Sequence, residues 1–156
     1  MTHLTEGTKA PEFTGVDQNG DKVSLAQFKG KKVVLYFYPQ DNTPTCTEQA
    51  CNLRDNYAAL QNEGIIVLGV SPDEVAKHKK FETKFTLPFT LLADTERTVI
   101  DKYGVWGEKK MYGKAYMGLL RTTFLIDEKG IIKKIFLKPK SKQHTEEILN
   151  AFKEIG

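Results

Sequence analysis

The chain has 156 residues and a mass of 17.7 kDa, so we expect one domain spanning residues 1–156. Its 40% hydrophobic and 28% charged residues exclude a disordered protein, and its net charge of +3 is too small for a nucleic-acid-binding protein. No apolar run approaches the roughly 20 residues of a membrane span, and residues 1–7 lack the features of a secretory signal. We therefore expect a cytoplasmic protein with neither a nucleic acid nor a membrane as partner.

Apolar periodicity and turn residues predict the elements along the chain. Alternating segments at 12–16 and 22–25, joined through Asn19-Gly20, predict an N-terminal β-hairpin. Continuous apolar runs predict buried strands at 32–38 and 65–71, and further strands are expected at 89–92, 121–127 and 131–137. Helices are predicted at 44–63, 72–85, 94–103 and 145–155, with a loop and a short hairpin over 104–118.

The order of these elements predicts the fold class. Strands that alternate with helices imply a parallel core, and the late pair of strands adds antiparallel neighbours. We therefore expect an α/β protein with a thioredoxin-like fold, in which helices flank a mixed central sheet and a β-hairpin precedes it.

The two cysteines of the chain are Cys46 and Cys51. In a reducing compartment such a pair is more often catalytic, redox-active or metal-binding than structural. Thr43 followed by Pro44 is typical of a helix start, which places Cys46 in a first turn, where free N–H groups and the helix dipole favour a thiolate. Because a buried strand precedes this helix, Cys46 is expected at the carboxyl edge of the sheet, where α/β folds build their sites. We expect its sulfur to be ionised and exposed there.

The spacing of the two cysteines argues against a permanent disulfide. On a regular helix, residues five positions apart have Cα atoms roughly 8.7 Å apart. Disulfides need Cα separations below about 7 Å. Cys46 and Cys51 can therefore bridge only if the first turns of the helix unwind, which favours a redox cycle with local unfolding.

Thiolate formation alone does not make a cysteine react fast as a nucleophile. A lower pKa raises the thiolate fraction but reduces intrinsic nucleophilicity, so the net gain is only a few-fold. A fast reaction also needs donors aimed at the atoms where charge develops. The Thr43 hydroxyl and a cation delivered from elsewhere in the chain are the candidates.

Other interpretations of these residues stay open at this point. Either cysteine can be a small buried residue, and Thr43 can serve only as a helix cap. A zinc site is disfavoured because the spacing is not C-x₂₋₄-C and no second ligand pair follows, and the missing C-x-x-C disfavours a simple disulfide oxidoreductase. His3, His78 and His144 are scattered and are interpreted as surface or helix-face residues.

Three blocks of the sequence resemble a known family. The pattern Pro39-x-x-x-Thr43-x-x-Cys46 resembles the active-site signature of the peroxiredoxins. The run from Thr43 to Asp55 is similar to the bacterioferritin comigratory protein (peroxiredoxin Q) branch, as are the blocks at 104–109 and 121–127. The resemblance extends from about Pro11 to the last helix.

This resemblance implies a role for five residues. Cys46 would be the peroxidatic cysteine, which attacks the peroxide O–O bond and becomes a sulfenic acid. Cys51 would be the resolving cysteine that closes an intramolecular disulfide. Thr43 would hydrogen-bond the peroxide and the thiolate, Pro39 would shield the thiolate from water, and Arg121 would hold the thiolate and polarise the peroxide.

The resemblance also implies substrates and partners. The protein would reduce hydrogen peroxide and organic hydroperoxides, and a thioredoxin-type donor would recycle it without metal, haem or flavin. A monomer is expected, as is common in this branch. A non-enzymatic redox sensor or binding module with the same cysteine switch is the alternative, and no residue is diagnostic of a chaperone activity. Without the resemblance, Arg121 would not stand out from Arg54 or Arg97.

Overall fold

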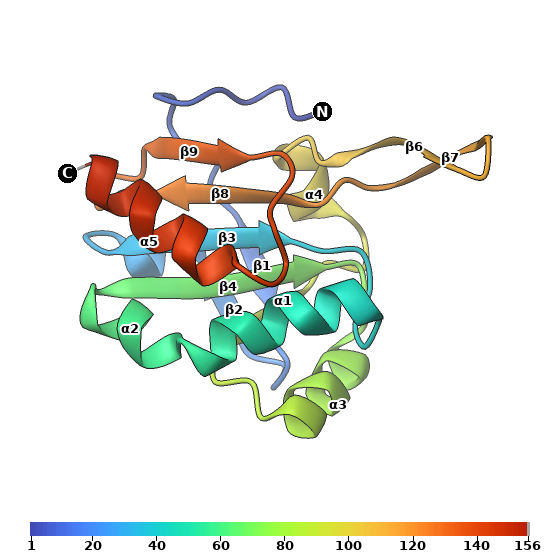
Figure 1. Cartoon of the computed structure of the whole chain (residues 1–156), viewed down its shortest axis with the longest axis horizontal. Coiled ribbons are helices and arrows are strands. Elements are labelled where there is room, and N and C mark those ends of the chain that lie inside the picture. The colour runs from blue at the N-terminus through green and yellow to red at the C-terminus, as the bar shows by residue number, and fades with distance from the viewer. Residues whose placement is uncertain (156) are drawn as a thin grey trace.

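The structure is a computed structural model, and it describes residues 1–155 (Figure 1). At its centre lies a five-stranded sheet in the order β5–β4–β3–β8–β9. These strands are β3 (Lys32–Phe37), β4 (Ile65–Ser71), β5 (Thr90–Ala93), β8 (Thr122–Ile126) and β9 (Ile132–Phe136). Strands β3, β4 and β5 are parallel, whereas β8 is antiparallel to β3 and β9 is antiparallel to β8. The predicted mixed sheet is confirmed.

Both faces of the sheet are covered (Figure 1). One face packs against α1 (Pro44–Asp55), α2 (Tyr57–Asn62), α3 (Val75–Phe85) and α5 (His144–Ile155). The other packs against α4 (Thr98–Lys102) and the N-terminal hairpin of β1 (Thr14–Val16) and β2 (Lys22–Ser24). Residues of β3 alternate between the two cores, because successive side chains of a strand point to opposite faces. This arrangement explains why β3 is apolar throughout.

The predicted helix at 44–63 is two helices, α1 and α2, separated at Asn56. The side chain of Asn56 donates to the Asn52 carbonyl at 2.8 Å, and the Thr145 hydroxyl of α5 donates to the same oxygen at 3.2 Å. The backbone N–H of Asn56 bonds instead to the Arg54 carbonyl. The helix therefore ends at Asn56, because two side chains donate hydrogen bonds to the Asn52 carbonyl, which the Asn56 N–H would bind in a continuous helix.

Other elements are shifted or longer than predicted. Helix α3 begins at Val75 rather than at Pro72, and α4 begins only at Thr98, because the Asp94 carboxylate accepts the N–H groups of Val99 and Ile100 and holds the preceding turn. A 3₁₀-helix at Leu25–Phe28 was not predicted. The other boundaries agree with the predicted ranges to within about two residues.

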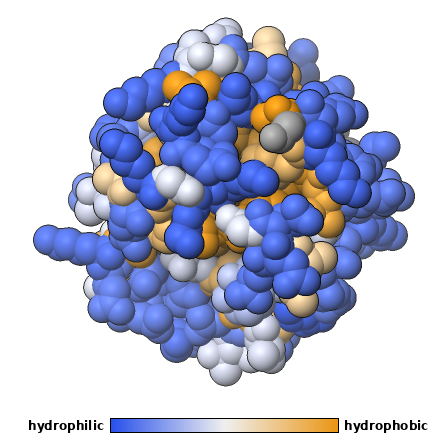
Figure 2. Space-filling model, turned by 90° about the vertical axis from the view of Figure 1, so that its left-hand side faces the viewer, coloured by the Kyte–Doolittle hydropathy of each residue, from blue (hydrophilic) through white to orange (hydrophobic). Residues whose placement is uncertain are grey.

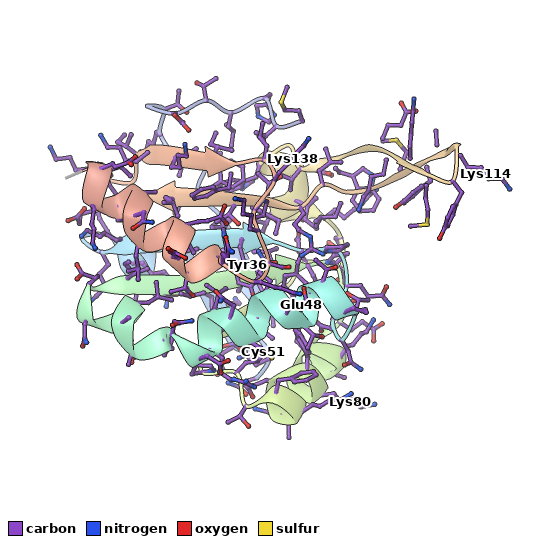
Figure 3. All side chains as sticks on the ribbon, viewed as in Figure 1. Tyr36, Glu48, Cys51, Lys80, Lys114 and Lys138 are labelled. Atoms are coloured by element: carbon purple, nitrogen blue, oxygen red, sulfur yellow. The ribbon has the colours of Figure 1, made fainter. Side chains whose placement is uncertain are left out.

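The segment expected to be a loop with a short hairpin is a two-stranded ribbon of β6 (Trp106–Met111) and β7 (Lys114–Leu119). The ribbon projects from the body of the molecule, with Lys114 at its tip (Figures 1 and 3). Its strands carry lysine and glycine at many positions, so no clear apolar alternation marks them.

The surface at the end of the molecule seen in Figure 2 is largely hydrophilic, with apolar side chains visible mainly in the hollows between polar ones. No helix within residues 1–155 is long and apolar enough to span a bilayer.

Candidate active site

Cys46 lies in the first turn of α1, as predicted. Thr43 has the extended backbone of an N-cap residue, and Pro44 is the first helical residue. The expected exposure of the sulfur is wrong, because Cys46 is only 1% exposed. The buried residues of α1 are Cys46, Gln49, Ala50 and Leu53, which form one helical stripe facing the sheet. Cys46 is the first residue of that stripe, so it faces inward.

Arg121 reaches this buried sulfur. Its Nη2 donates to Cys46 Sγ at 3.1 Å. Arg121 directly precedes β8, and Thr122 at the start of β8 pairs with Phe37 at the end of β3. Antiparallel pairing thus brings the arginine to the edge of the sheet where α1 begins. A guanidinium N–H donated to sulfur stabilises negative charge on that atom.

Gln49 is a further residue of the site, which the sequence analysis did not single out. It is fully buried one turn after Cys46, and its Oε1 accepts a hydrogen bond from Arg121 Nη1 at 3.0 Å. The two arms of the guanidinium therefore bind the sulfur and the amide on one helix. A polar residue on the apolar stripe of α1 was the sequence signal that could have revealed it.

Thr43 and Pro39 lie in the segment that joins β3 to α1, and the Thr43 hydroxyl has another partner than expected. The Thr43 hydroxyl donates to the Gln40 carbonyl at 3.0 Å, and the side chain accepts no capping bond from the helix. The Thr43 carbonyl accepts the Thr47 N–H at 2.8 Å. Thr43 and Pro39 are both half-buried, and within residues 1–155 neither is hydrogen-bonded to Cys46.

Cys51 is half-buried and lies on the same continuous helix as Cys46 (Figure 3). Both thiols are free. This agrees with the prediction that the two sulfurs do not bridge while α1 is intact.

Tyr36 lies under this helix with an unusual hydroxyl group. Its side chain is fully buried, and within residues 1–155 its Oη has no hydrogen-bond partner. Burial raises the pKa of Tyr36 well above its ordinary value, and the charge of Cys46 raises it further. Gly69 on β4 makes room for the ring, because a Cβ there would lie 2.9 Å from Tyr36 Cζ.

Lys109 of β6 adds a second cation near the site. Burial lowers the pKa of Lys109 below its ordinary value, and the positive charge of Arg121 lowers it further. The nearby charge of Cys46 acts in the opposite direction and raises it. Lys109, the fourth residue of β6, therefore lies within electrostatic range of the Cys46–Arg121 pair.

Two of the three histidines, His78 of α3 and His144 of α5, are helix residues as expected, but they face the interior and not the surface. His78 and His144 are fully buried, and each is hydrogen-bonded through both ring nitrogens. Within residues 1–155, His, Cys, Asp and Glu side chains form no group of three that could hold a metal ion.

Comparison with known proteins identifies the family. Residues 7–135 match the AhpC/TSA family. The chain is 46% identical to the peroxiredoxin Bcp of Escherichia coli K12, over 99% of both chains. Its fold is similar to that of Xylella fastidiosa PrxQ, with a TM-score of 0.92, 28% identity and coverage of 99% and 98% of the two chains.

A third similar protein is the Xanthomonas campestris bacterioferritin comigratory protein, whose structures were studied for alkyl peroxide reduction. It is 31% identical, with a TM-score of 0.85 and coverage of 91% and 90% of the two chains.

These likenesses and the buried thiol beside an arginine define a thiol peroxidase with a thioredoxin-like fold. The chain belongs to the AhpC/TSA family and, within it, to the peroxiredoxin Q (Bcp) branch. It is an oxidoreductase that acts on a peroxide and is returned to its starting state by a reductant. The alternative of a non-enzymatic sensor is not supported.

Proposed function

We propose that Cys46 is the peroxidatic cysteine of this enzyme. Its thiolate sulfur attacks one peroxide oxygen, the O–O bond breaks, and the sulfur becomes a sulfenic acid. The other oxygen leaves with the electron pair of the broken bond, takes up a proton, and departs as water or an alcohol. The 3.1 Å hydrogen bond from Arg121 to the sulfur is the observation that carries this proposal.

The surrounding residues have distinct roles in this step. Arg121 holds the sulfur and stabilises the charge that develops on the peroxide oxygens. The Thr43 hydroxyl turns from the Gln40 carbonyl to the bound peroxide, and Pro39 limits the access of water. Because Cys46 is buried, a peroxide reaches it through the more exposed surface formed by Thr43, Pro39 and Arg121.

Cys51 is the resolving cysteine in the proposed cycle. Its sulfur attacks the sulfenic sulfur of Cys46, forms the disulfide, and releases water. The first turns of α1 unwind for this step, because both cysteines are helical in the reduced protein. A thioredoxin-type dithiol then supplies two electrons and two protons and restores both thiols.

The substrate range and cellular setting are part of the proposal. Alkyl peroxide reduction was studied for the Xanthomonas relative, which supports organic hydroperoxides beside hydrogen peroxide as substrates. We place the enzyme in the cytoplasm as a monomer, where a reducing compartment keeps both thiols ready.

Two cysteine variants test the cycle. Cys46→Ser is expected to abolish peroxide consumption in a thioredoxin-coupled assay. Cys51→Ser is expected to react once and stop as a sulfenic acid, which dimedone labelling and mass spectrometry detect. The oxidised wild-type protein should weigh two hydrogens less than the reduced protein. Sustained turnover by Cys46→Ser would rule out the assignment.

A further inference from the structure

A buried hydrogen-bonded chain links the active-site loop to the rest of the fold. The loop at 38–43 joins β3 to α1 and contains Asp41, which is only 2% exposed. Asp41 Oδ2 lies 2.6 Å from Nδ1 of the fully buried His78 on α3, and Asp41 Oδ1 accepts the Tyr38 hydroxyl at 2.6 Å. His78 Nε2 lies 2.9 Å from the Leu92 carbonyl of β5. One loop carboxylate is thereby connected to Tyr38, the residue that follows β3, and to α3, which in turn is bound to β5.

The proton positions follow from the partners. A carbonyl oxygen only accepts, so His78 Nε2 carries a proton and donates it to Leu92. A second proton lies between His78 Nδ1 and Asp41 Oδ2 and forms the short hydrogen bond between these two atoms. Both carboxylate oxygens of Asp41 and both nitrogens of His78 are therefore satisfied, which a buried polar pair requires.

Neighbouring contacts strengthen this attachment. The Asp41 N–H donates to Asp73 Oδ2 at 2.6 Å, just before α3, and Lys84 of α3 donates to Asn42 Oδ1 at 3.2 Å. Within the loop, the Thr43 hydroxyl donates a hydrogen bond to the Gln40 carbonyl. The segment between Pro39 and Thr43 is thus hydrogen-bonded to α3 and to the turn that precedes α3.

We propose that the Asp41–His78 pair is a positioning element of the peroxidase site. It fixes the loop that carries Pro39 and Thr43 and leads directly into the first turn of α1 with Cys46. Because its contacts precede α1, unwinding of the helix leaves them in place, and the loop acts as a fixed hinge. This inference rests on the proposed function and adds two residues that touch neither the sulfur nor the peroxide.

The structure suggests variants that separate positioning from stability. His78→Leu leaves the Asp41 carboxylate buried without its imidazole partner, which destabilises the fold. The double variant Asp41→Ala/His78→Leu removes the buried carboxylate and the imidazole but leaves the Tyr38 hydroxyl without its acceptor. We therefore expect its urea-unfolding midpoint to lie above that of His78→Leu and below that of the wild type. Asp41→Asn keeps the connection, because the new amide can accept from Tyr38 and donate to a neutral His78.

The decisive measurement is the rate of Cys46 oxidation in a single turnover, followed by rapid quenching, thiol alkylation and mass spectrometry. In the double variant we expect the rate constant of Cys46 oxidation to fall by about tenfold or more, although its urea-unfolding midpoint is higher than that of His78→Leu. In Asp41→Asn we expect this rate constant to stay within about threefold of the wild-type value. Disulfide formation with Cys51, measured in the same samples, is expected to be unchanged or faster, because the loop no longer steadies the first turn of α1.

A second buried histidine provides the matched control. His144 Nδ1 contacts Glu147 Oε1 at 2.9 Å within α5, and its Nε2 lies 2.9 Å from Thr123 Oγ1 of β8, so neither contact involves the loop. His144→Leu/Glu147→Ala should alter stability and leave the oxidation rate unchanged. If the double variant does not fold, Asp41→Ala alone, which leaves a neutral His78 bound to Leu92, is measured instead.

Two results would overturn the proposal. The first is oxidation of Cys46 at the wild-type rate in the double variant, or in Asp41→Ala where that replaces it. The second is a fall in the oxidation rate of the His144→Leu/Glu147→Ala control or of Asp41→Asn that equals the fall in the double variant. A parallel fall in oxidation and disulfide formation would indicate general loss of structure and would count against it too. Failure of the proposed function is distinguishable, because the wild type itself would then not be oxidised at Cys46.

Discussion

Gln49 holds Arg121 in place through a hydrogen bond of 3.0 Å between its Oε1 and the arginine Nη1. The other arm of the same guanidinium is bound to Cys46. Since Gln49 lies three residues after Cys46 on α1, the helix itself sets the spacing between the two groups that the arginine recognises. The guanidinium fork is the only part of this arrangement that comes from a distant segment.

Gln49→Met is expected to slow the oxidation of Cys46 by about tenfold, because it removes the acceptor that orients Arg121 while keeping a side chain of similar length. The free energy of unfolding should not fall, since the substitution also removes a buried amide nitrogen that has no partner in the described part of the chain, residues 1–155. Stopped-flow peroxide oxidation and urea unfolding check the two halves of this prediction. A slow variant that is also markedly less stable would contradict it.

Arg121→Lys is expected to cost about 100-fold or more in the peroxide step. A lysine keeps the charge, but its single ammonium does not reproduce the planar fork that binds the sulfur and Gln49 together. Arg54→Lys is the control, because Arg54 lies at the far end of α1, where it pairs with Asp55 and donates to the Phe85 carbonyl. Equal rates for Arg121→Lys and wild type would show that charge alone suffices.

Tyr36→Phe is expected to raise the free energy of unfolding by about 1 kcal/mol. Among residues 1–155 the buried hydroxyl of Tyr36 has no hydrogen-bond partner, so the folded state loses its solvation without compensation. Urea unfolding at neutral pH measures the change. A destabilised Phe variant would mean that the hydroxyl has a partner in solution.

The pH dependence of stability is expected to reflect His144. Burial lowers the pKa of His144 below its ordinary value of 6.5, although the hydrogen bond that its Nδ1 donates to Glu147 opposes the shift. The unfolded chain therefore binds a proton at this residue before the folded protein does. This contribution to stability is complete above about pH 6.5 and is lost as the pH falls from there toward the lowered pKa.

His144→Gln should flatten this part of the curve when urea midpoints are compared between about pH 5 and about pH 7.5. Wild type is expected to lose more stability than the variant over that range. Identical slopes for the two proteins would contradict the assignment to His144.

Local sequence patterns predicted most of the secondary structure. The apolar run of β4 corresponds to its strand from Ile65 to Ser71, and Thr43-Pro44 marked the start of α1. The break at Asn56 was missed, because it depends on Thr145 of α5 contacting the carbonyl of Asn52. The β6–β7 ribbon was underestimated, because its strands pair with each other and carry few core-facing residues.

Some residues of the candidate site could likewise be identified from local sequence patterns, and others could not. Cys46 and Thr43 were identified from the helix start and from the motif that they share with Pro39. Arg121 was chosen only through the family resemblance, since an arginine that begins a strand carries no local sign of its partner. Gln49, Tyr36 and the Asp41–His78 pair were not identified as site residues.

The sequence alone determined which segments form strands and helices, and that a cysteine lies in the first turn of a helix after a buried strand, because these depend on residues a few positions apart. Tertiary structure decided that this cysteine is buried and paired with Arg121, 75 positions away. It also decided that Asp41 meets His78 on another helix. Such contacts depend on the register between β3 and β8 and on the packing of α3 against the sheet, which no local pattern of residues specifies.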